Sequence, residues 1–389
     1  MQSAPLPVRL RTIAAEWARI GCTGFGGPPA HISLLRQLCV KRKEWLSAGE
    51  FEDAIAATNL LPGPASTQLA IYCAWRLRGW RGALLGGTCF ILPGLIVILA
   101  LSALFLESRP PHWVEGAAAG TGSAVAAVAL NAALGLALPS WARAGPGTTA
   151  RLRWAIYALA GAVAAAAIGP YLVLVLLCAG LAELAWRAFD APHGASPGAT
   201  ALAWLAAVAA PTGGIGALAW VALKVGGLSY GGGFVIVPLM QTDAVHHYHW
   251  MTSAQFLNAV ALGQVTPGPV VQTVAVVGYA AAKLGGGLLA ALIAFAPSFC
   301  FVLFGGRHFG RIRASSTAQG FLAGAGPAAI GAIAGAAVPL GLALAHVWQL
   351  GVLAGALVWL VARRGNVVLG LVGAGLIGVA ESFLGLPVG

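Results

Sequence analysis

Charged side chains are scarce in this chain: they make up 8% of its 389 residues, against 59% hydrophobic residues. A soluble globular protein of this length does not have that balance, and the mean hydropathy of +0.84 is typical of a membrane protein. Acidic residues are the rarer sign, with 11 Asp and Glu against 22 Lys and Arg. The basic residues are spread through short loops, so they indicate membrane orientation and not a nucleic-acid partner. We therefore expect an all-α polytopic membrane protein whose surroundings are a lipid bilayer.

Several chemical signatures are also missing. The six cysteines contain no CxxC pair, which argues against a metal centre or a disulfide framework. There is no GxxxxGK[ST] phosphate loop and no GxSxG nucleophile elbow, and no nucleophile stands beside a base. The N-terminus lacks an apolar stretch with a small-residue cleavage site, so we expect no removed signal peptide. The sequence thus predicts a protein that is not an enzyme and has neither cofactor nor metal.

One tripeptide occurs twice inside apolar sequence, as Pro62-Gly63-Pro64 and as Pro267-Gly268-Pro269. A helix cannot run unbroken through these prolines, whereas glycine permits a turn and a second proline suits the first position of a new helix. The new helix directs free N–H groups and the positive end of its dipole into the break, which favours an anion. Side-chain donors at or near the two breaks extend this candidate site: Ser66, Thr67, Gln68, Gln272 and Thr273.

The chain is internally duplicated. A shift of 205 residues aligns the two halves without a gap over about sixty residues, and it matches Trp45 with Trp250 as well as the two proline turns. The match continues more loosely afterwards, with an offset about ten residues smaller. We expect an N-terminal repeat over 1–187, a polar linker over 188–200 and a C-terminal repeat over 201–389.

The loop charges predict that the two repeats have opposite orientations. Lys41, Arg42 and Lys43 follow the first apolar unit of half one, whereas the matching loop of half two has no Lys or Arg from Asp243 to His249. The positive-inside rule then orients the halves upside down relative to each other. The cytoplasmic charges on both sides of the first proline unit are satisfied if that unit is a re-entrant hairpin. The number of full spans stays open, because residues 201–210 could supply an extra crossing.

A second, glycine-rich break precedes the proline turn in each half: Gly26 and Gly27 in one, and Tyr230, Gly231 and Gly232 in the other. Irregular backbone at membrane depth is tolerated only where protein or water covers it. Tight helix packing explains such glycines, but two matched breaks per half are typical of a transporter core.

A cation, Arg19 or Lys224, precedes the glycine-rich break by the same interval in each half. A cation kept at this position in both halves could attract an anion. Alternatively, each side chain extends to the membrane interface and has no role in binding.

Three polar residues lie near the breaks of half one only. His31 is matched by Ile236 and Asp53 by Asn258, so the site is expected to be asymmetric. Glu52 or Asp53 could carry a coupling proton, because carboxylates on transport paths often do. An ordinary salt bridge to the basic loop fits these carboxylates equally well.

On these paired motifs the chain resembles the chromate ion transporter family, and within it the long two-domain members. The resemblance implies a bacterial inner-membrane protein of two homologous, oppositely oriented domains that exports chromate and confers resistance, with sulfate as a competitor. The second half departs from the pattern by having Gly233 in place of Pro28 and Ile236 in place of His31. The motif positions that the resemblance carries over are Gly26, Gly27, Pro28, His31, Pro62, Gly63, Pro64, Thr67, Gln68, Gly231, Gly232, Gly233, Thr266, Pro267, Gly268, Pro269 and Gln272.

The function expected from residues and resemblance together is secondary active transport of a tetrahedral oxyanion, with chromate efflux first. Sulfate uptake and a passive anion channel are the alternatives, since chromate and sulfate share shape and charge. A membrane enzyme that holds a phosphorylated lipid is a third hypothesis, which the missing acid/base pair argues against. A homodimer is left open.

Overall fold

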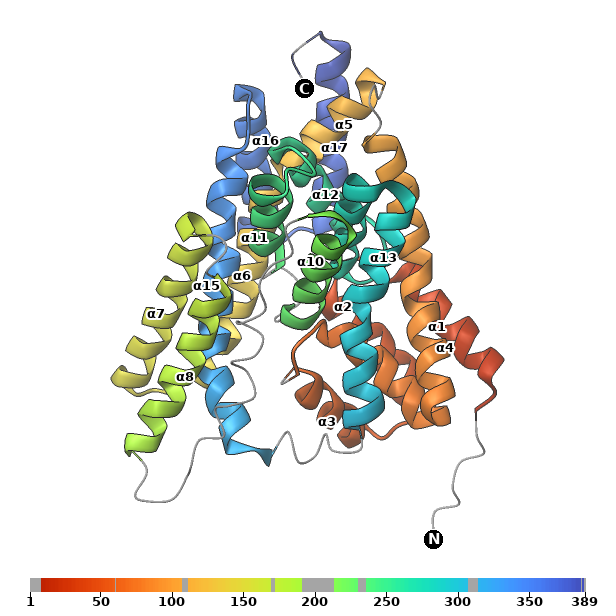
Figure 1. Ribbon diagram of the computed structural model, residues 1–389, viewed down its shortest axis with the longest axis vertical. Helices are drawn as coiled ribbons and strands as arrows, with labels where there is room; N and C mark the ends of the chain where they lie inside the picture. Colours follow the sequence, from red (N-terminus) through yellow and green to blue (C-terminus); the bar gives the residue numbers. More distant parts are fainter. Residues whose placement is uncertain are drawn as a thin grey trace. The chain divides into compact units, whose positions relative to one another are not determined.

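The protein is described by a computed structural model that covers residues 8–59, 61–106, 111–168, 172–190, 213–229, 236–306, 314–385 and 387. Every regular element in these ranges is a helix (Figure 1), which confirms the all-α class. Five of the helices are long and apolar enough to cross a membrane: Ala65–Phe105, His112–Arg143, Leu172–Phe189, Val270–Gly305 and Ser316–Leu342.

The helices of the first half are α1 (Leu10–Thr23), α2 (Pro28–Arg36), the π-helix η1 (Gln37–Arg42), α3 (Ala48–Thr58), α4 (Ala65–Phe105), α5 (His112–Ser123), α6 (Val125–Arg143), α7 (Thr148–Val163), the π-helix η2 (Ala164–Ile168) and α8 (Leu172–Asp190). Those of the second half are α10 (Gly214–Leu228), α11 (Ile236–Gln241), the π-helix η4 (Thr242–His247), α12 (Ser253–Val265), the 3-10 helix η5 (Val270–Gln272), α13 (Thr273–Gly305), α15 (Ser316–Leu342), α16 (Val347–Leu357), the π-helix η7 (Val358–Ala362) and α17 (Val367–Phe383).

The duplication in the sequence reappears in local backbone structure. The π-helices η1 and η4 occupy positions that differ by the same 205 residues, and π-turns of this kind are rare. Glu44 and His249 stand at matched positions and both have positive φ, at 49° and 52°. The proline turns match as well, with Gly63 at φ 114° and Gly268 at φ 98°. Unusual conformations at one offset indicate that each half folds by the same local rules.

The chain forms two compact units, and each unit draws on both halves of the sequence. Unit 1 contains Met1–Ser108, Ala222–Gly233 and Leu262–Arg313. Unit 2 contains Arg109–Val221, Phe234–Ala261 and Ala314–Gly389. These spatial units differ from the sequence repeats expected above, and they do not test the repeat boundaries, which stay a prediction.

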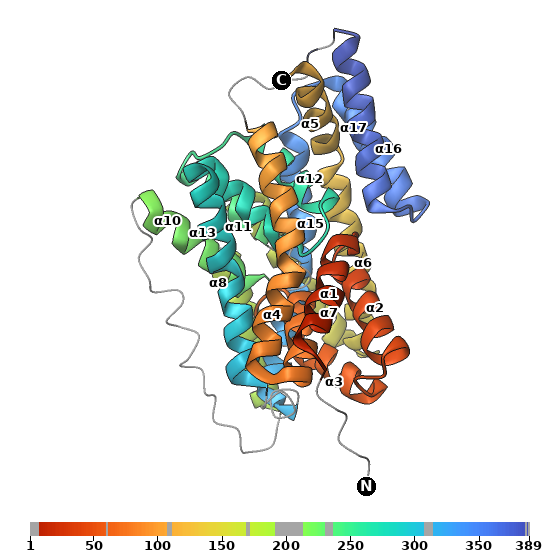
Figure 2. The same ribbon diagram turned by 90° about the vertical axis from the view of Figure 1, so that its right-hand side faces the viewer.

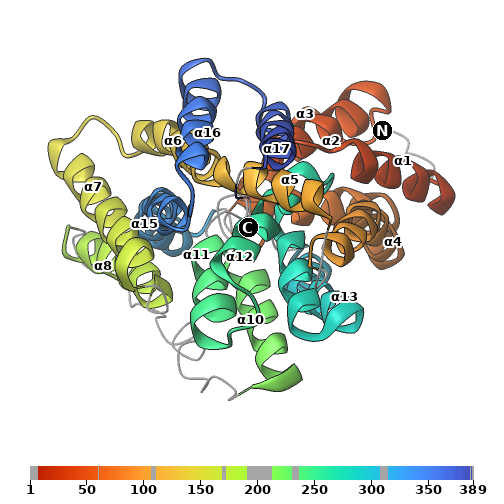
Figure 3. The ribbon, with the colours of Figure 1, turned by 90° about the horizontal axis from the view of Figure 1, so that it is seen from above.

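Unit 1 is built around α4 and α13, which lie side by side in all three views (Figures 1, 2 and 3). Both helices are sharply kinked, at Arg78 and Gly79 in α4 and at Ala282 and Lys283 in α13. Each therefore folds back on itself as two limbs. A Cβ on Gly82 would meet the carbonyl of Ala74 at 2.2 Å, so the two limbs of α4 pack with their backbones in contact.

Unit 2 is a bundle in which α15 packs against α6, α7 and α8, and α5 packs against α17. Small residues make these contacts close: a Cβ on Gly331 would lie 1.7 Å from the carbonyl of Ala158, and one on Gly161 would lie 1.8 Å from that of Ala328. Small residues at helix crossings are the usual way for membrane helices to approach each other.

Candidate functional site

The first break of half one is held by a buried histidine. α1 ends at Thr23, and α2 starts with two prolines after Gly27, whose φ is 72°. The His31 side chain is fully buried, with Nε2 2.9 Å from the Gly24 carbonyl oxygen and Nδ1 3.3 Å from Ser66 Oγ. Because Ser66 lies in the first turn of α4, His31 joins the glycine-rich break to the helix that follows the proline turn.

The first proline turn forms the tip of a short helical hairpin. α3 has 11 residues and begins with a capping box between Ser47 and Glu50. At about 1.5 Å per residue it is about 16 Å long, well short of the roughly 30 Å of a bilayer core. Arg76, near the end of the first limb of α4, donates a hydrogen bond to Glu50 and so closes the base of the hairpin. The same interaction lowers the pKa of Glu50. The structure thus contains a short helical hairpin at this position, and its re-entrant placement in the bilayer stays a prediction.

The turn of half two packs against half one. The Gly268 N–H donates to the Gly24 carbonyl oxygen at 3.0 Å. Gln272 Nε2 donates to the Ile91 carbonyl oxygen at 2.7 Å. A Cβ on Gly94 would lie 2.0 Å from the Pro267 carbonyl oxygen, so the turn sits directly on α4.

The turn of half one packs against half two in the reciprocal way. A Cβ on Gly63 would lie 3.3 Å from the Gly226 carbonyl oxygen in α10 and 3.5 Å from Ser298 Oγ in α13. Gln68 Nε2 reaches back to the Pro62 carbonyl oxygen at 2.6 Å and steadies the turn. Each proline turn thus lies against the helices of the other repeat, and both belong to unit 1.

The second limbs of α4 and α13 run antiparallel. A Cβ on Gly87 would meet the Phe299 ring at 2.5 Å, and one on Gly287 would meet Leu99 Cδ2 at 2.5 Å. The early part of one limb therefore contacts the late part of the other. Since the two limbs occupy equivalent places in the two repeats, antiparallel packing is what opposite orientation of the repeats requires.

Unit 1 contains a group of buried polar atoms that have no hydrogen-bond partner. Side-chain polar groups are nearly always satisfied when buried, and leaving one unpaired costs about 1–3 kcal/mol. Across the described residues seven such atoms occur, and unit 1 holds all of them except Glu381 Oε2. The other six are Thr67 Oγ1, Gln68 Oε1, Ser229 Oγ, Gln264 Nε2, Gln272 Oε1 and Ser298 Oγ. We name these six residues the unpaired polar cluster.

The unpaired polar cluster surrounds the crossed turns. Thr67 and Gln68 stand in the first turn of α4, where Pro64 provides no side-chain cap, and Gln272 ends the short helix η5 after the second turn. Ser298 approaches Gly63, and Ser229 follows Gly226 on α10. Five of the six side chains are no more than 1% exposed, and Gln264 is 8% exposed. An anion could accept from four of the six atoms, the hydroxyls of Thr67, Ser229 and Ser298 and the amide nitrogen of Gln264, together with helix N–H groups. The amide oxygens of Gln68 and Gln272 only accept, and their nitrogens already donate to Pro62 and Ile91, so these two residues do not bind the anion in this arrangement.

Three members of this cluster were not singled out in the sequence, namely Ser229, Gln264 and Ser298. The only signal for Gln264 was its match with Asn59 at the repeat offset. Conversely, three expected donors already have partners: Ser66 is near His31, Thr266 Oγ1 donates to Leu262 and Thr273 Oγ1 to Val270. Tyr230, Gly231 and Gly232 lie outside the described residues.

The charged residues expected at the site differ in exposure and partners. Arg19 is 53% exposed and pairs with Glu16 at 3.1 Å on its own helix. Lys224 is half-buried on α10 and takes part in an interaction. Glu52 forms an ion pair with Arg36, and Asp53 is exposed. Anion attraction by the two cations and proton coupling by the two carboxylates stay predictions.

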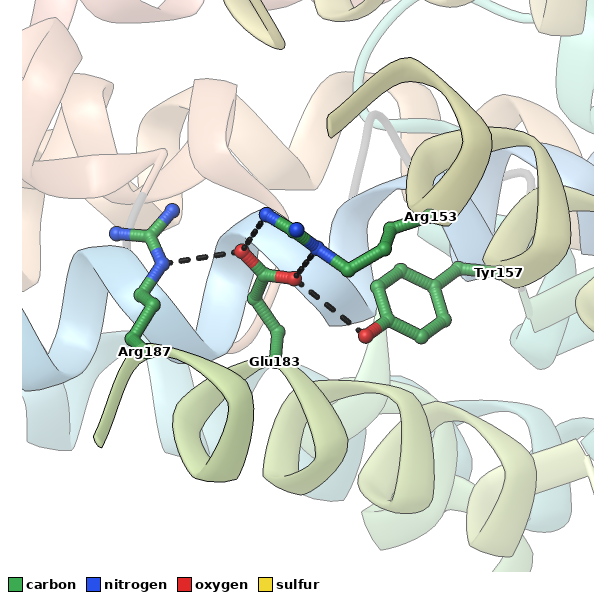
Figure 4. A network of polar contacts seen from close by, with 4 residues as sticks. All are labelled: Arg153, Tyr157, Glu183 and Arg187. Carbon is green, nitrogen blue, oxygen red and sulfur yellow. Dashed lines mark hydrogen bonds and ion pairs between the residues drawn. The ribbon is translucent and has the colours of Figure 1, made fainter. Parts of the chain in front are cut away.

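Unit 2 has one strongly charged buried cluster, shown in Figure 4. Glu183 on α8 is 5% exposed, and its carboxylate accepts from Arg153 Nε at 2.9 Å and Arg187 Nε at 3.0 Å. Tyr157 Oη donates to the same carboxylate at 3.4 Å. Arg153 also lies over the Trp186 ring, with 5.0 Å from Cζ to the ring centroid. Both carboxylate oxygens are satisfied, so the cluster fits a structural clamp between α7 and α8.

The described part of the chain offers no metal site. There, no group of three or more His, Cys, Asp or Glu side chains is arranged to hold a metal ion. The arrangement that remains for chemistry is the unpaired polar cluster at the crossed turns.

Comparison with known proteins gives a consistent assignment. The family model described as chromate transporter matches residues 11–184 and 216–379. The chain is 31% identical over 339 residues to the chromate transport protein of Cupriavidus metallidurans, which covers 85% of this chain and 82% of that protein. It is 30% identical over 358 residues to the chromate transport protein of Pseudomonas aeruginosa, covering 87% and 83%. It is 28% identical to the probable chromate transport protein of Synechococcus elongatus, covering 87% and 86%. No solved structure matches the chain.

Proposed function

The chain belongs to the chromate transporter family, and on this basis we propose that it carries tetrahedral oxyanions across a bacterial inner membrane, with chromate efflux as its activity. The observation that carries the proposal is the unpaired polar cluster at the two crossed proline turns. Hydroxyl, amide and backbone donors can replace part of the hydration shell of a dianion. Such a set holds the ion without a fully buried cation, so release stays easy.

Transport is proposed to proceed by alternating access. The proline turns of the two repeats lie in one unit, and the second limbs of α4 and α13 pack antiparallel, as expected for inverted repeats that enclose a site at the bilayer midplane.

Loop charge supports the inverted orientation in the second part of each repeat too. Arg143, Arg151 and Arg153 lie around the connection between α6 and α7, whereas the equivalent residues 343–346 have no Lys or Arg. The connection between α16 and α17 has Arg363 and Arg364, whereas its counterpart 169–171 has neither. The alternation is that of the positive-inside rule applied to two opposed repeats.

Flux in proteoliposomes tests the proposal. We expect saturable chromate uptake that excess sulfate inhibits, that depends on an imposed ion gradient and that reverses when the gradient is reversed. Single-channel conductance steps, or flux indifferent to every gradient, would instead establish a channel. The direction in cells is read from growth on chromate: cells that express the protein should tolerate more chromate than empty-vector cells, and greater sensitivity would indicate uptake.

A further inference from the structure

A separate cavity lies between helix α1 on one side and helices α2 and η1 on the other. We call this interface the seam. The volume of the cavity is about 270 Å³, far above the roughly 10–15 Å³ that one water requires. Arg19, Thr23, Gln37 and Arg42 supply its polar lining, and the side chains of Ile20 and Leu38 its apolar lining. The lining residues recur every three or four positions along the chain. One face of α1 therefore forms one wall of the cavity, and one face of α2 and η1 forms the other.

Arg19 and Arg42, which both line the cavity, are bridged by the carboxylate of Glu16, which is not itself a lining residue. Glu16 Oε2 is 3.1 Å from Arg19 Nη2, and Glu16 Oε1 is 2.5 Å from Arg42 Nη2. The carboxylate is 16% exposed, whereas the two arginine side chains are 53% and 41% exposed. The three groups carry one net positive charge, and each guanidinium has further N–H donors besides the one used here.

The cavity leads towards the site at the crossed turns. Thr23, at the inner end of α1, lines the cavity, and the next residue is Gly24. The Gly24 carbonyl oxygen accepts from the Gly268 N–H and contacts His31 Nε2. The cavity lining thus ends one residue before the glycine that contacts the second proline turn.

We propose that this seam is a second oxyanion site, an entry site, and that Glu16 is its built-in competitor. At rest the carboxylate of Glu16 occupies the place between Arg19 and Arg42. A tetrahedral dianion offers the same two guanidinium groups more charge and more acceptor oxygens, so it displaces the carboxylate. The inference rests on the proposed function, because it assigns a further station to the same substrate.

The second half lacks the competitor. At the repeat offset, Arg19 corresponds to Lys224 and Arg42 to His247, but Glu16 corresponds to Val221. The displaceable carboxylate thus belongs to one repeat only. The two repeats are therefore expected to bind the same ion with different affinities at these equivalent positions.

The test is equilibrium binding of chromate, with labelled sulfate as a second probe, to the full-length protein in lipid nanodiscs. Glu16→Gln should tighten chromate binding about two- to fivefold, since exposed ion pairs of this kind are worth little each. Arg42→Gln should weaken binding, and adding Glu16→Gln to it should restore much less than Glu16→Gln gains alone. Glu115→Gln is the matched control, because it removes a surface ion pair with His112 in unit 2, outside the proposed sites, and it should leave binding unchanged.

Three outcomes would overturn the entry site. If Glu16→Gln binds chromate no more tightly than the parent protein, and the parent protein shows normal flux, Glu16 does not compete with the oxyanion. An equal gain in the Arg42→Gln background shows that Glu16 acts elsewhere. More anionic phospholipid per molecule in Glu16→Gln, with chromate affinity unchanged, assigns the seam to a lipid headgroup phosphate. If the parent protein itself binds and transports no oxyanion, the proposed function fails as well.

Discussion

The two units of this protein differ in how many buried polar side-chain atoms lack a partner: among the described residues unit 1 has six and unit 2 has one, Glu381 Oε2. In unit 1 six buried side-chain atoms are neutral and unpaired, and they gather at the crossed proline turns. In unit 2 the buried Glu183 is charged and has partners on both oxygens. A satisfied cluster fixes one packing arrangement, whereas an unsatisfied cluster is stable only if the rest of the unit supports it and gains a partner when an anion arrives. On this comparison we propose that unit 1 binds the substrate and that unit 2 is scaffold.

The largest expected effect concerns the backbone contacts that keep the crossed turns in place. A Cβ on Gly226 would lie 2.0 Å from the Ala294 carbonyl oxygen, so Gly226→Ala should separate α10 from α13 and abolish chromate flux. The neighbouring Gly227 has no atom within 4 Å of its Cβ position, which makes Gly227→Ala the matched control with flux close to the parent level. Flux in proteoliposomes at equal protein content decides the matter. Full activity in Gly226→Ala would show that this contact does not position the site.

The next effect is on the stability of unit 2. Glu183→Gln leaves two arginines without their counter-charge, and breaking a buried pair costs on the order of 3 kcal/mol. We expect a clearly lower melting temperature in detergent, with the flux per folded molecule unchanged. Glu115→Gln, which removes an exposed pair with His112, should change the melting temperature little. Loss of flux at unchanged stability would move Glu183 from the scaffold into the transport path.

The unpaired polar cluster should respond in the opposite sense. Ser298→Ala removes a buried hydroxyl without a partner, so the melting temperature should stay the same or rise. A hydrogen bond to a charged ligand is worth about 1.5–3 kcal/mol, so chromate affinity should fall about 10- to 150-fold. Ser102→Ala on α4 is the control, because that buried hydroxyl already donates to Ile98. Unchanged affinity in Ser298→Ala would contradict the assignment of the cluster as the binding site.

Much of this arrangement could be predicted from the sequence, because it depends on backbone chemistry. Proline interrupts a helix and glycine readily takes a positive φ, so the turn at Gly63 and its copy at Gly268 followed directly from their residues. Loop charge predicted a hairpin at the first proline turn, and a short helical hairpin is found there; its re-entrant placement stays a prediction. Ser229 and Ser298 could not be recognised, since a single serine in an apolar helix is usually satisfied by its own backbone. Only the packing of α10 and α13 around the turn makes these two unpaired.

The Glu183 cluster illustrates a second limit. Glu183 and Arg187 are one helical turn apart, and their pairing follows from spacing alone. Arg153 lies thirty residues earlier, and its contact with Glu183 depends on how α7 packs beside α8. The exposure of Arg19 was also beyond the sequence argument, because a cation before a break can face either the break or the outside. Its pairing with Glu16 favours the outer face.

The smallest expected effect concerns the cations, and it sharpens the contrast between neutral core and charged periphery. If the neutral cluster holds the ion, the double variant Arg19→Gln with Lys224→Gln should lower chromate affinity only about two- to fivefold, because exposed charges are screened. The loss should shrink further as salt rises, whereas the loss in Ser298→Ala should be nearly independent of salt. Titrations at low and high potassium chloride separate the two cases. A loss in the double variant as large as that in Ser298→Ala, and insensitive to salt, would place the cations in the binding site itself and make the neutral cluster secondary.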